Sequence, residues 1–154
     1  MKIIAHRANL NGPNIKSENK FQSIRKCLDL GYDVEIDIRL LDGKLFLGHD
    51  IPQESIEIEE LMEINDKCWI HCKNLEALTF LNKNGKGLNY FWHENDSYTL
   101  TSKGFIWTYP GKNTNYSCIC VMPELFIEQS SFDNLLDMRV AGVCTDYPNK
   151  FKTD

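Results

Sequence analysis

Residues 33–50 read DVEIDIRLLDGKLFLGHD, and this stretch decides the fold. In its first half, apolar residues alternate with Glu35, Asp37 and Arg39. Strand residues two apart share a face, so Glu35 and Asp37 project in the same direction. Two carboxylates on a face turned into the protein are unfavourable unless a cation compensates them. The stretch therefore predicts a strand over residues 33–39 that carries a candidate metal site.

Two neighbouring strand-like runs also end in titratable residues. The run Ile3-Ile4-Ala5 leads into His6, and Leu45-Phe46-Leu47-Gly48 leads into His49. In a barrel of parallel strands, the active site lies at the C-terminal ends of the strands. These neighbours favour a functional site over the other interpretation of residues 33–39, a half-exposed antiparallel strand with its polar face in water.

The Asp42-Gly43 pair predicts a hairpin, and the register of that hairpin decides where His49 points. A two-residue turn at 42–43 pairs position 35 with position 50 and directs His49 away from Glu35. A three-residue loop over 41–43, with Gly43 as a bulge residue, pairs position 35 with position 49. By strand alternation, only the longer loop places His49 beside the carboxylates.

Strand and helix patterns alternate along the chain, which favours a parallel α/β sheet or barrel. A complete eight-unit barrel needs about 250 residues, more than the 154 present. We expect a single domain over residues 1–154, a reduced TIM-type (β/α) barrel of parallel strands with helices shortened or missing between residues 94 and 130. The expected strands are 2–6, 33–39, 44–49, 68–73, 88–93, 105–109, 117–122 and 141–145. The expected helices run from an N-cap at Ser17 to Gly31 and over 57–65, 75–85 and 131–139.

Composition limits the partners and the compartment. A net charge of −5 and the absence of long basic clusters argue against nucleic acid as the main partner. No apolar run approaches the roughly 20 residues that span a bilayer, so no stable membrane insertion is expected. No signal peptide is expected before the first strand, which predicts a cytoplasmic protein whose six cysteines stay reduced, with Cys118 and Cys120 buried. The oligomeric state is open.

The ordered motifs resemble a known family. His6-Arg7, Ser17-Glu18-Asn19, Glu35-x-Asp37, Asp42-Gly43 and His49-Asp50 look like the glycerophosphodiester phosphodiesterase signature, within the superfamily of phosphatidylinositol-phospholipase-C-like phosphodiesterases. The resemblance returns at residues 142–148, GVCTDYP, which look like the closing strand and loop of that family. Residues 75–130 match poorly, but within them residues 91–96, FWHEND, and 107–111, WTYPG, look like segments of a short-chain subgroup of the family.

This resemblance implies roles for the matched residues. His6 and His49 would be the catalytic pair that moves protons on opposite sides of the phosphorus. Glu35 and Asp37 would hold a divalent ion, Mg²⁺ or Ca²⁺, with Mn²⁺ as a third candidate. Arg7 would bind the phosphate through its guanidinium group, and Glu18 is expected to support the loop after His6.

The chain departs from the family at its third strand. His71-Cys72-Lys73 stands where the family has Glu-x-Lys, so histidine replaces the third acidic ligand. We predict that a ring nitrogen of His71 binds the ion at about 2.0–2.3 Å, and that metal affinity falls in acid. Lys73 is expected to contact phosphate. His93 is a candidate ligand or substrate contact and Trp107 a candidate substrate contact, although each could instead be structural.

The resemblance predicts a metal-dependent hydrolase of glycerophosphodiester-like or sugar-linked phosphodiesters, in lipid or surface-polysaccharide metabolism. Two alternatives stay open. In the first, a hydroxyl of the substrate attacks its own phosphate, as in phospholipase-D/C-like lyases that release a cyclic phosphate. In the second, the protein is a non-catalytic phosphate or glycan binder in which His71 has abolished turnover.

Overall fold

The structure, a computed structural model, describes residues 1–128 and 139–151 and centres on strand β2 (Asp33–Leu41). Strand β2 pairs in parallel with β1 and β5 and, through its last residues, in antiparallel with β3. The parallel strands follow the order β6 (Asn89–Trp92), β5 (Cys68–Cys72), β2, β1 (Lys2–Ala5), β10 (Gly142–Thr145), β9 (Cys118–Val121) and β8 (Ile106–Thr108). The antiparallel additions are β3 (Lys44–Leu47), β4 (Glu54–Ile56) and β7 (Tyr98–Leu100).

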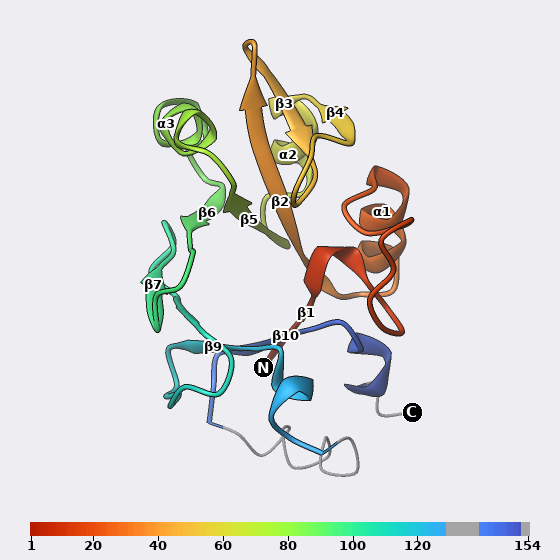
Figure 1. Ribbon diagram of the computed structural model, residues 1–154, viewed down its shortest axis with the longest axis vertical. Coiled ribbons are helices and arrows are strands. Elements are labelled where there is room, and N and C mark those ends of the chain that lie inside the picture. Colours follow the sequence, from red (N-terminus) through yellow and green to blue (C-terminus); the bar gives the residue numbers. More distant parts are fainter. Residues whose placement is uncertain (129–138, 152–154) are drawn as a thin grey trace.

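The expected parallel α/β arrangement is present, but the sheet does not close into a barrel. Figure 1 shows the strands curving around a common centre, with α1 and α3 on the outside. Within the described residues, β6 and β8 share no backbone ladder. The rings of Phe91 and Trp107 lie 4.5 Å apart between these two strands, and the backbone N–H of Ser102 donates to the carbonyl of Tyr90. The chain is too short for eight units, so aromatic packing and the β7 hairpin bridge the gap.

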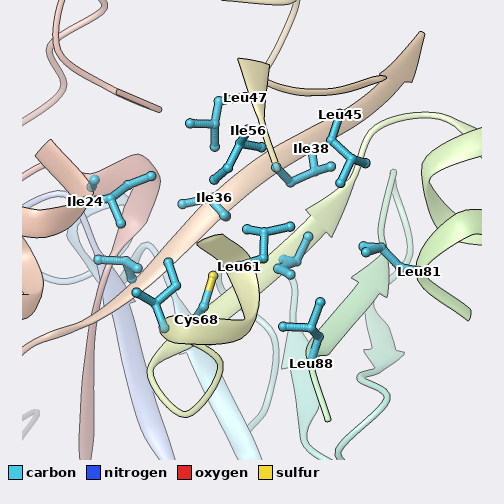
Figure 2. Packing of buried hydrophobic residues seen from close by; sticks show 14 of the residues in the cluster. Ile24, Ile36, Ile38, Leu45, Leu47, Ile56, Leu61, Cys68, Leu81 and Leu88 are labelled. Carbon is cyan, nitrogen blue, oxygen red and sulfur yellow. The ribbon is translucent and has the colours of Figure 1, made fainter. Parts of the chain in front are cut away.

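Among the described residues, the α-helices cover only the part of the sheet built from the first ninety residues. They are α1 (Phe21–Asp29), α2 (Ile58–Glu63) and α3 (Leu75–Asn84). Figure 2 shows Ile36 and Ile38 of β2 in one apolar cluster with Ile24 of α1 and Leu61 of α2. Residues 94–128, all described, contain no α-helix, as the chain length predicted. No helix in the described part of the chain is long and apolar enough to cross a membrane.

The two faces of β2 have different environments. Val34, Ile36 and Ile38 are fully buried against the helices. The alternate residues, including Glu35 and Asp37, turn to the opposite face. A second apolar cluster comes from the strands around that inner side: Ile4, Trp69, Phe91, Trp107, Ile119, Val121 and Cys144. The strand alternation predicted from residues 33–39 is therefore correct, and it brings both carboxylates inside the curved sheet.

Several sequence-based boundaries differ from the structure. Helix α1 begins at Phe21 and not after Ser17, because residues 15–19 form turns that bring Asn19 to Arg7. The first helical N–H, on Phe21, donates to a carboxylate oxygen of Glu54 at 2.8 Å. Strands β4 and β7 were not predicted. The helix expected over 131–139 lies outside the described residues, apart from its last position. Cys118 and Cys120 are buried free thiols, as predicted.

The hairpin has the shorter of the two loops, so the inference that only the longer loop brings His49 beside the carboxylates is wrong. Leu41 pairs with Lys44, so the turn has two residues, with both Asp42 and Gly43 at positive φ. Strand β3 ends at Leu47, and the chain then turns at Gly48, which has a φ of 142°. The sequence argument assumed that strand alternation continues to position 49. The break at Gly48 removes that constraint and brings His49 beside Asp37.

We expect Gly48→Ala to destabilise the protein by about 1–3 kcal/mol. A Cβ at this position would lie 2.0 Å from the carbonyl oxygen of Ile51 and would sit on a residue with positive φ. Urea denaturation of the variant and the wild type measures the effect.

Gly43→Ala is the matched control. Gly43 also has positive φ, at 77°, but an added Cβ there meets nothing within 4 Å. The loss of stability in Gly43→Ala should therefore reflect backbone strain alone and should be smaller than the loss in Gly48→Ala. Equal losses at the two positions would contradict the steric explanation for the turn at Gly48.

Candidate active site

A cleft of about 410 Å³ lies where the parallel strands end. Its walls come from β2, β5, β8 and β9 and from the segments that follow β1, β3, β5, β6, β8 and β9. Every candidate residue of the sequence analysis except Asp37 lines this cleft: His6, Arg7, Glu35, His49, His71, Lys73, His93 and Trp107. Asp37 is fully buried and contacts several of them. The structure therefore brings the whole predicted set together.

Asp37 is contacted by polar side chains from three parts of the chain. The side-chain amide of Asn19 donates to Oδ2 at 2.8 Å, and the backbone N–H of Asp37 donates back to Oδ1 of Asn19 at 2.9 Å. On the other carboxylate oxygen, Oδ1, His49 Nδ1 lies at 3.1 Å and His71 Nδ1 at 3.3 Å. These contacts fix the carboxylate in one orientation.

Glu35 anchors the turn that carries His6 and Arg7. Its Oε2 accepts the backbone N–H of Arg7 at 2.9 Å and lies 4.0 Å from His6 Nε2. Arg7 and Ala8 both have positive φ in a 3-10 turn, η1 (His6–Ala8), that directly follows β1. The carboxylate thus holds a tight turn that leaves both side chains at the cleft.

The two carboxylates differ in their proton affinity. Burial, together with the charge of Asp37, raises the pKa of Glu35. Burial would also raise the pKa of Asp37, but the imidazoles of His49 and His71, when they are protonated, outweigh it by hydrogen bonding and by their charge and hold that pKa well below its usual range. The pair therefore concentrates negative charge on Asp37, and a cation beside both groups would favour ionisation of Glu35.

Glu35, Asp37 and His71 offer donor atoms within 4.8 Å of one another, one oxygen from each carboxylate and one ring nitrogen. His71 pairs with Asp37 across β5 and β2 and turns to the same inner side, as its spacing from Lys73 predicted. Whether the three bind an ion stays a prediction. Asp33, the next inward acid on β2, instead bonds Lys2 at 2.9 Å and Trp69 Nε1 at 3.0 Å.

Asp146 is a site residue to which the sequence analysis gave no role. It follows β10, and its Oδ1 lies 2.9 Å from Nδ1 of His6 and 2.9 Å from the side-chain nitrogen of Asn9. The carboxylate of Glu124 in turn accepts the backbone N–H of Asp146 at 2.8 Å and the hydroxyl of Thr145 at 3.0 Å. The sequence does contain a sign of this role, because Asp146 follows an apolar strand-like run as His6 does. Local patterns do not reveal, however, that two residues 140 positions apart form a hydrogen bond.

The basic candidates lie around the carboxylates. Arg7 Nε is 3.5 Å from Asp37 Oδ2 and Arg7 Nη1 is 3.5 Å from Glu18, which supports this loop as expected. Lys73 Nζ lies 3.9 Å from Asp37. His93 Nδ1 is buried without a hydrogen bond and lies 3.8 Å from Asp96.

Trp107 is buried between Phe91 and Trp69, so it forms the floor of the cleft and exposes only 3% of its surface. A direct substrate contact from Trp107 stays a prediction.

Comparisons with known proteins add one finding. No protein-family model and no curated protein matches the chain. Among solved structures, it is similar to the crystal structure of a "putative glycerophosphodiester phosphodiesterase" from Galdieria sulphuraria, with a TM-score of 0.54 and 14% sequence identity over 97% of this chain and 95% of that chain. The two chains share one fold. This likeness supports the family resemblance at the level of the fold, and the chemistry has to be argued from the residues of this chain.

We expect Asp146→Asn to lower the pKa of His6. Burial by itself lowers that pKa, but the hydrogen bond to Asp146, the charge of Glu35 and the charge of Asp146 outweigh it, so the pKa is raised above its ordinary value. Replacing the carboxylate by an amide removes the charge, so His6 should lose its proton at lower pH. NMR titration of the imidazole signals in chelator-treated protein measures the change.

Glu18→Gln is the control for this titration. It removes a nearby charge that contacts Arg7 and leaves the bond between His6 and Asp146 intact. The His6 titration should stay close to that of the wild type. An unchanged His6 titration in Asp146→Asn would contradict the assigned role of Asp146.

Proposed function

We propose that this chain is a metal-dependent phosphodiester hydrolase acting on glycerophosphodiester-like or sugar-linked phosphodiesters. One observation carries the proposal: two histidines flank a buried pair of carboxylates in one cleft. His6 lies near Glu35, and His49 lies near Asp37. The Galdieria protein, with which the chain shares a fold, is described as a "putative glycerophosphodiester phosphodiesterase", which agrees with this reaction; because one fold hosts many functions, the residues of the cleft are the main support.

The residues present fit a divalent metal ion. Glu35 and Asp37 provide carboxylate oxygens, the ligands that Mg²⁺, Ca²⁺ and Mn²⁺ share, and His71 adds a nitrogen. Their combined charge of −2, with a neutral imidazole, would be balanced by a divalent ion. When bound, such an ion would polarise the phosphoryl group and offset the negative charge on its oxygens.

The surroundings of the two histidines suit proton transfer, because a carboxylate orients each ring. In each ring, Nδ1 lies beside a carboxylate oxygen, of Asp146 for His6 and of Asp37 for His49. This contact holds the hydrogen on Nδ1 of the neutral ring and leaves Nε2 as the nitrogen available to a substrate. We infer that one ring, in its neutral form, takes the proton of the attacking water at Nε2, while the other ring, in its doubly protonated form, gives its Nε2 proton to the leaving alcohol oxygen.

Arg7 and Lys73 are the proposed phosphate-binding residues. Both line the cleft, and their ion pairs with Asp37 are long, at 3.5 and 3.9 Å. Arg39 is engaged elsewhere, because its guanidinium group donates to the backbone carbonyls of His49 and Lys73. The basic groups therefore do not form the short pairs with both carboxylates that we would expect of a binder without a metal.

Purified protein should hydrolyse glycerophosphodiesters and bis(p-nitrophenyl) phosphate in the presence of Mg²⁺, Ca²⁺ or Mn²⁺, and a chelator should abolish this activity. His6→Ala and His49→Ala should each lower kcat by about 10²- to 10⁴-fold, the usual contribution of a general acid or base. Colorimetric release of p-nitrophenol measures the rates.

Arg25→Ala is the control variant, because Arg25 forms an exposed ion pair with Glu63 on the helical face away from the cleft. Its activity should match the wild type. Activity that survives both histidine substitutions would contradict the proposal. Phosphorus NMR identifies the products: monoester from the first time points supports hydrolysis, whereas an accumulating cyclic phosphate favours the lyase alternative.

A further inference from the structure

The imidazole of His71 is held in one orientation by the neighbouring strand. Its Nε2 lies 2.8 Å from the backbone carbonyl oxygen of His93, just beyond β6. A carbonyl oxygen only accepts hydrogen bonds, so Nε2 carries the hydrogen. The ring also stacks on Phe91, with centroids 5.1 Å apart and planes inclined by 13°, and the side chain is only 12% exposed. A neutral His71 therefore presents Nδ1 as a lone pair in a fixed direction.

This lone pair faces the two buried carboxylates. Nδ1 of His71 lies 3.3 Å from Oδ1 of Asp37 and 3.8 Å from Oε1 of Glu35. Ionised carboxylates are also acceptors only, so three electron-rich atoms point toward one another. Such a group is stabilised either by a second proton on His71 or by a cation that all three atoms share.

The distances favour the shared cation. Both exceed the usual 2.7–3.2 Å of an N–H···O hydrogen bond, and Oδ1 of Asp37 already has Nδ1 of His49 at 3.1 Å. Ligands bound to one ion at about 2.1 Å and at right angles lie about 3 Å from each other. The two distances from Nδ1, 3.3 and 3.8 Å, approach this value, and the three residues offer donor atoms within 4.8 Å of one another.

We propose that His71 shifts the preference of this site toward transition-metal ions such as Mn²⁺ and Co²⁺, relative to Mg²⁺ and Ca²⁺. Imidazole suits transition metals, whereas Mg²⁺ and Ca²⁺ prefer oxygen ligands throughout. The carbonyl of His93 acts as the positioning group, because it keeps the hydrogen on Nε2 and leaves Nδ1 for the ion. This inference rests on one part of the proposed function, the metal site, and does not require that the protein hydrolyses phosphodiesters.

Pulsed electron paramagnetic resonance of Mn²⁺ bound to the chelator-treated full chain tests this directly. We expect electron spin-echo modulation from a directly bound ¹⁴N nucleus in the wild type. His71→Glu should keep Mn²⁺ binding, because it supplies a carboxylate in the same place, but should lose the nitrogen signal. In calorimetric titrations, the ratio of Mn²⁺ affinity to Ca²⁺ affinity should fall by about tenfold or more in this variant.

The other cleft histidines provide matched controls. His49→Ala removes the second imidazole beside Asp37, and His93→Gln changes a side chain while leaving in place the carbonyl that orients His71. Both variants should keep the ¹⁴N modulation. If the signal disappears in His49→Ala and survives in His71→Glu, then His49 is the nitrogen ligand and the inference is wrong.

The remaining outcomes separate this inference from the proposed function. Mn²⁺ bound without a nitrogen signal would overturn the role of His71, even in an enzyme that turns over phosphodiesters. A nitrogen signal that depends on His71 in a protein without phosphodiesterase activity would support the metal site and contradict the proposed function. Failure of the wild type to bind any of the four ions would overturn the inference and leave a protonated His71 as the partner of the carboxylates.

Discussion

Glu35 and Asp37 place two carboxylates inside the protein, where water cannot solvate their charge. Much of the surrounding structure supplies donors to them. The loop after β1 folds back so that Arg7 donates to Glu35 and Asn19 donates to Asp37. The hairpin after β2 brings His49 to the same carboxylate, and β5 brings His71. The buried charges of Glu35 and Asp37 need polar partners, and each segment that supplies such a partner ends at the cleft. The position of the site follows from this need.

The sheet is asymmetric in a way that fits a short chain. Its first half has helices packed over Val34, Ile36 and Ile38, so the strand that carries the carboxylates is held on its outer face. Its second half has no α-helix between residues 94 and 128, and an aromatic cluster around Trp107 fills the inner side instead. Among the described residues, helix packing is thus concentrated behind the proposed metal ligands, where precise placement matters most.

Local patterns predicted the strands well because alternation and turn residues act over a few positions. The inward direction of Glu35 and Asp37 followed from the two-residue period alone. The same reasoning failed at His49, because it assumed an unbroken strand through Gly48, and at Ser17, because the donor that caps α1 comes from tertiary contact with Glu54. The expectation of a barrel failed for a related reason. The periodicity of short segments does not reveal whether the two end strands of a sheet pair with each other.

The sequence by itself determined which residues bear the chemistry and which face of β2 they occupy, because residue type and strand period are local properties. Only the tertiary structure decided how these residues act together. Asp146 reaches His6 from the far end of the chain, and the carbonyl of His93 selects which nitrogen of His71 faces the carboxylates. Such pairings depend on how strands from distant parts of the chain lie beside one another, and no short stretch of sequence contains that information.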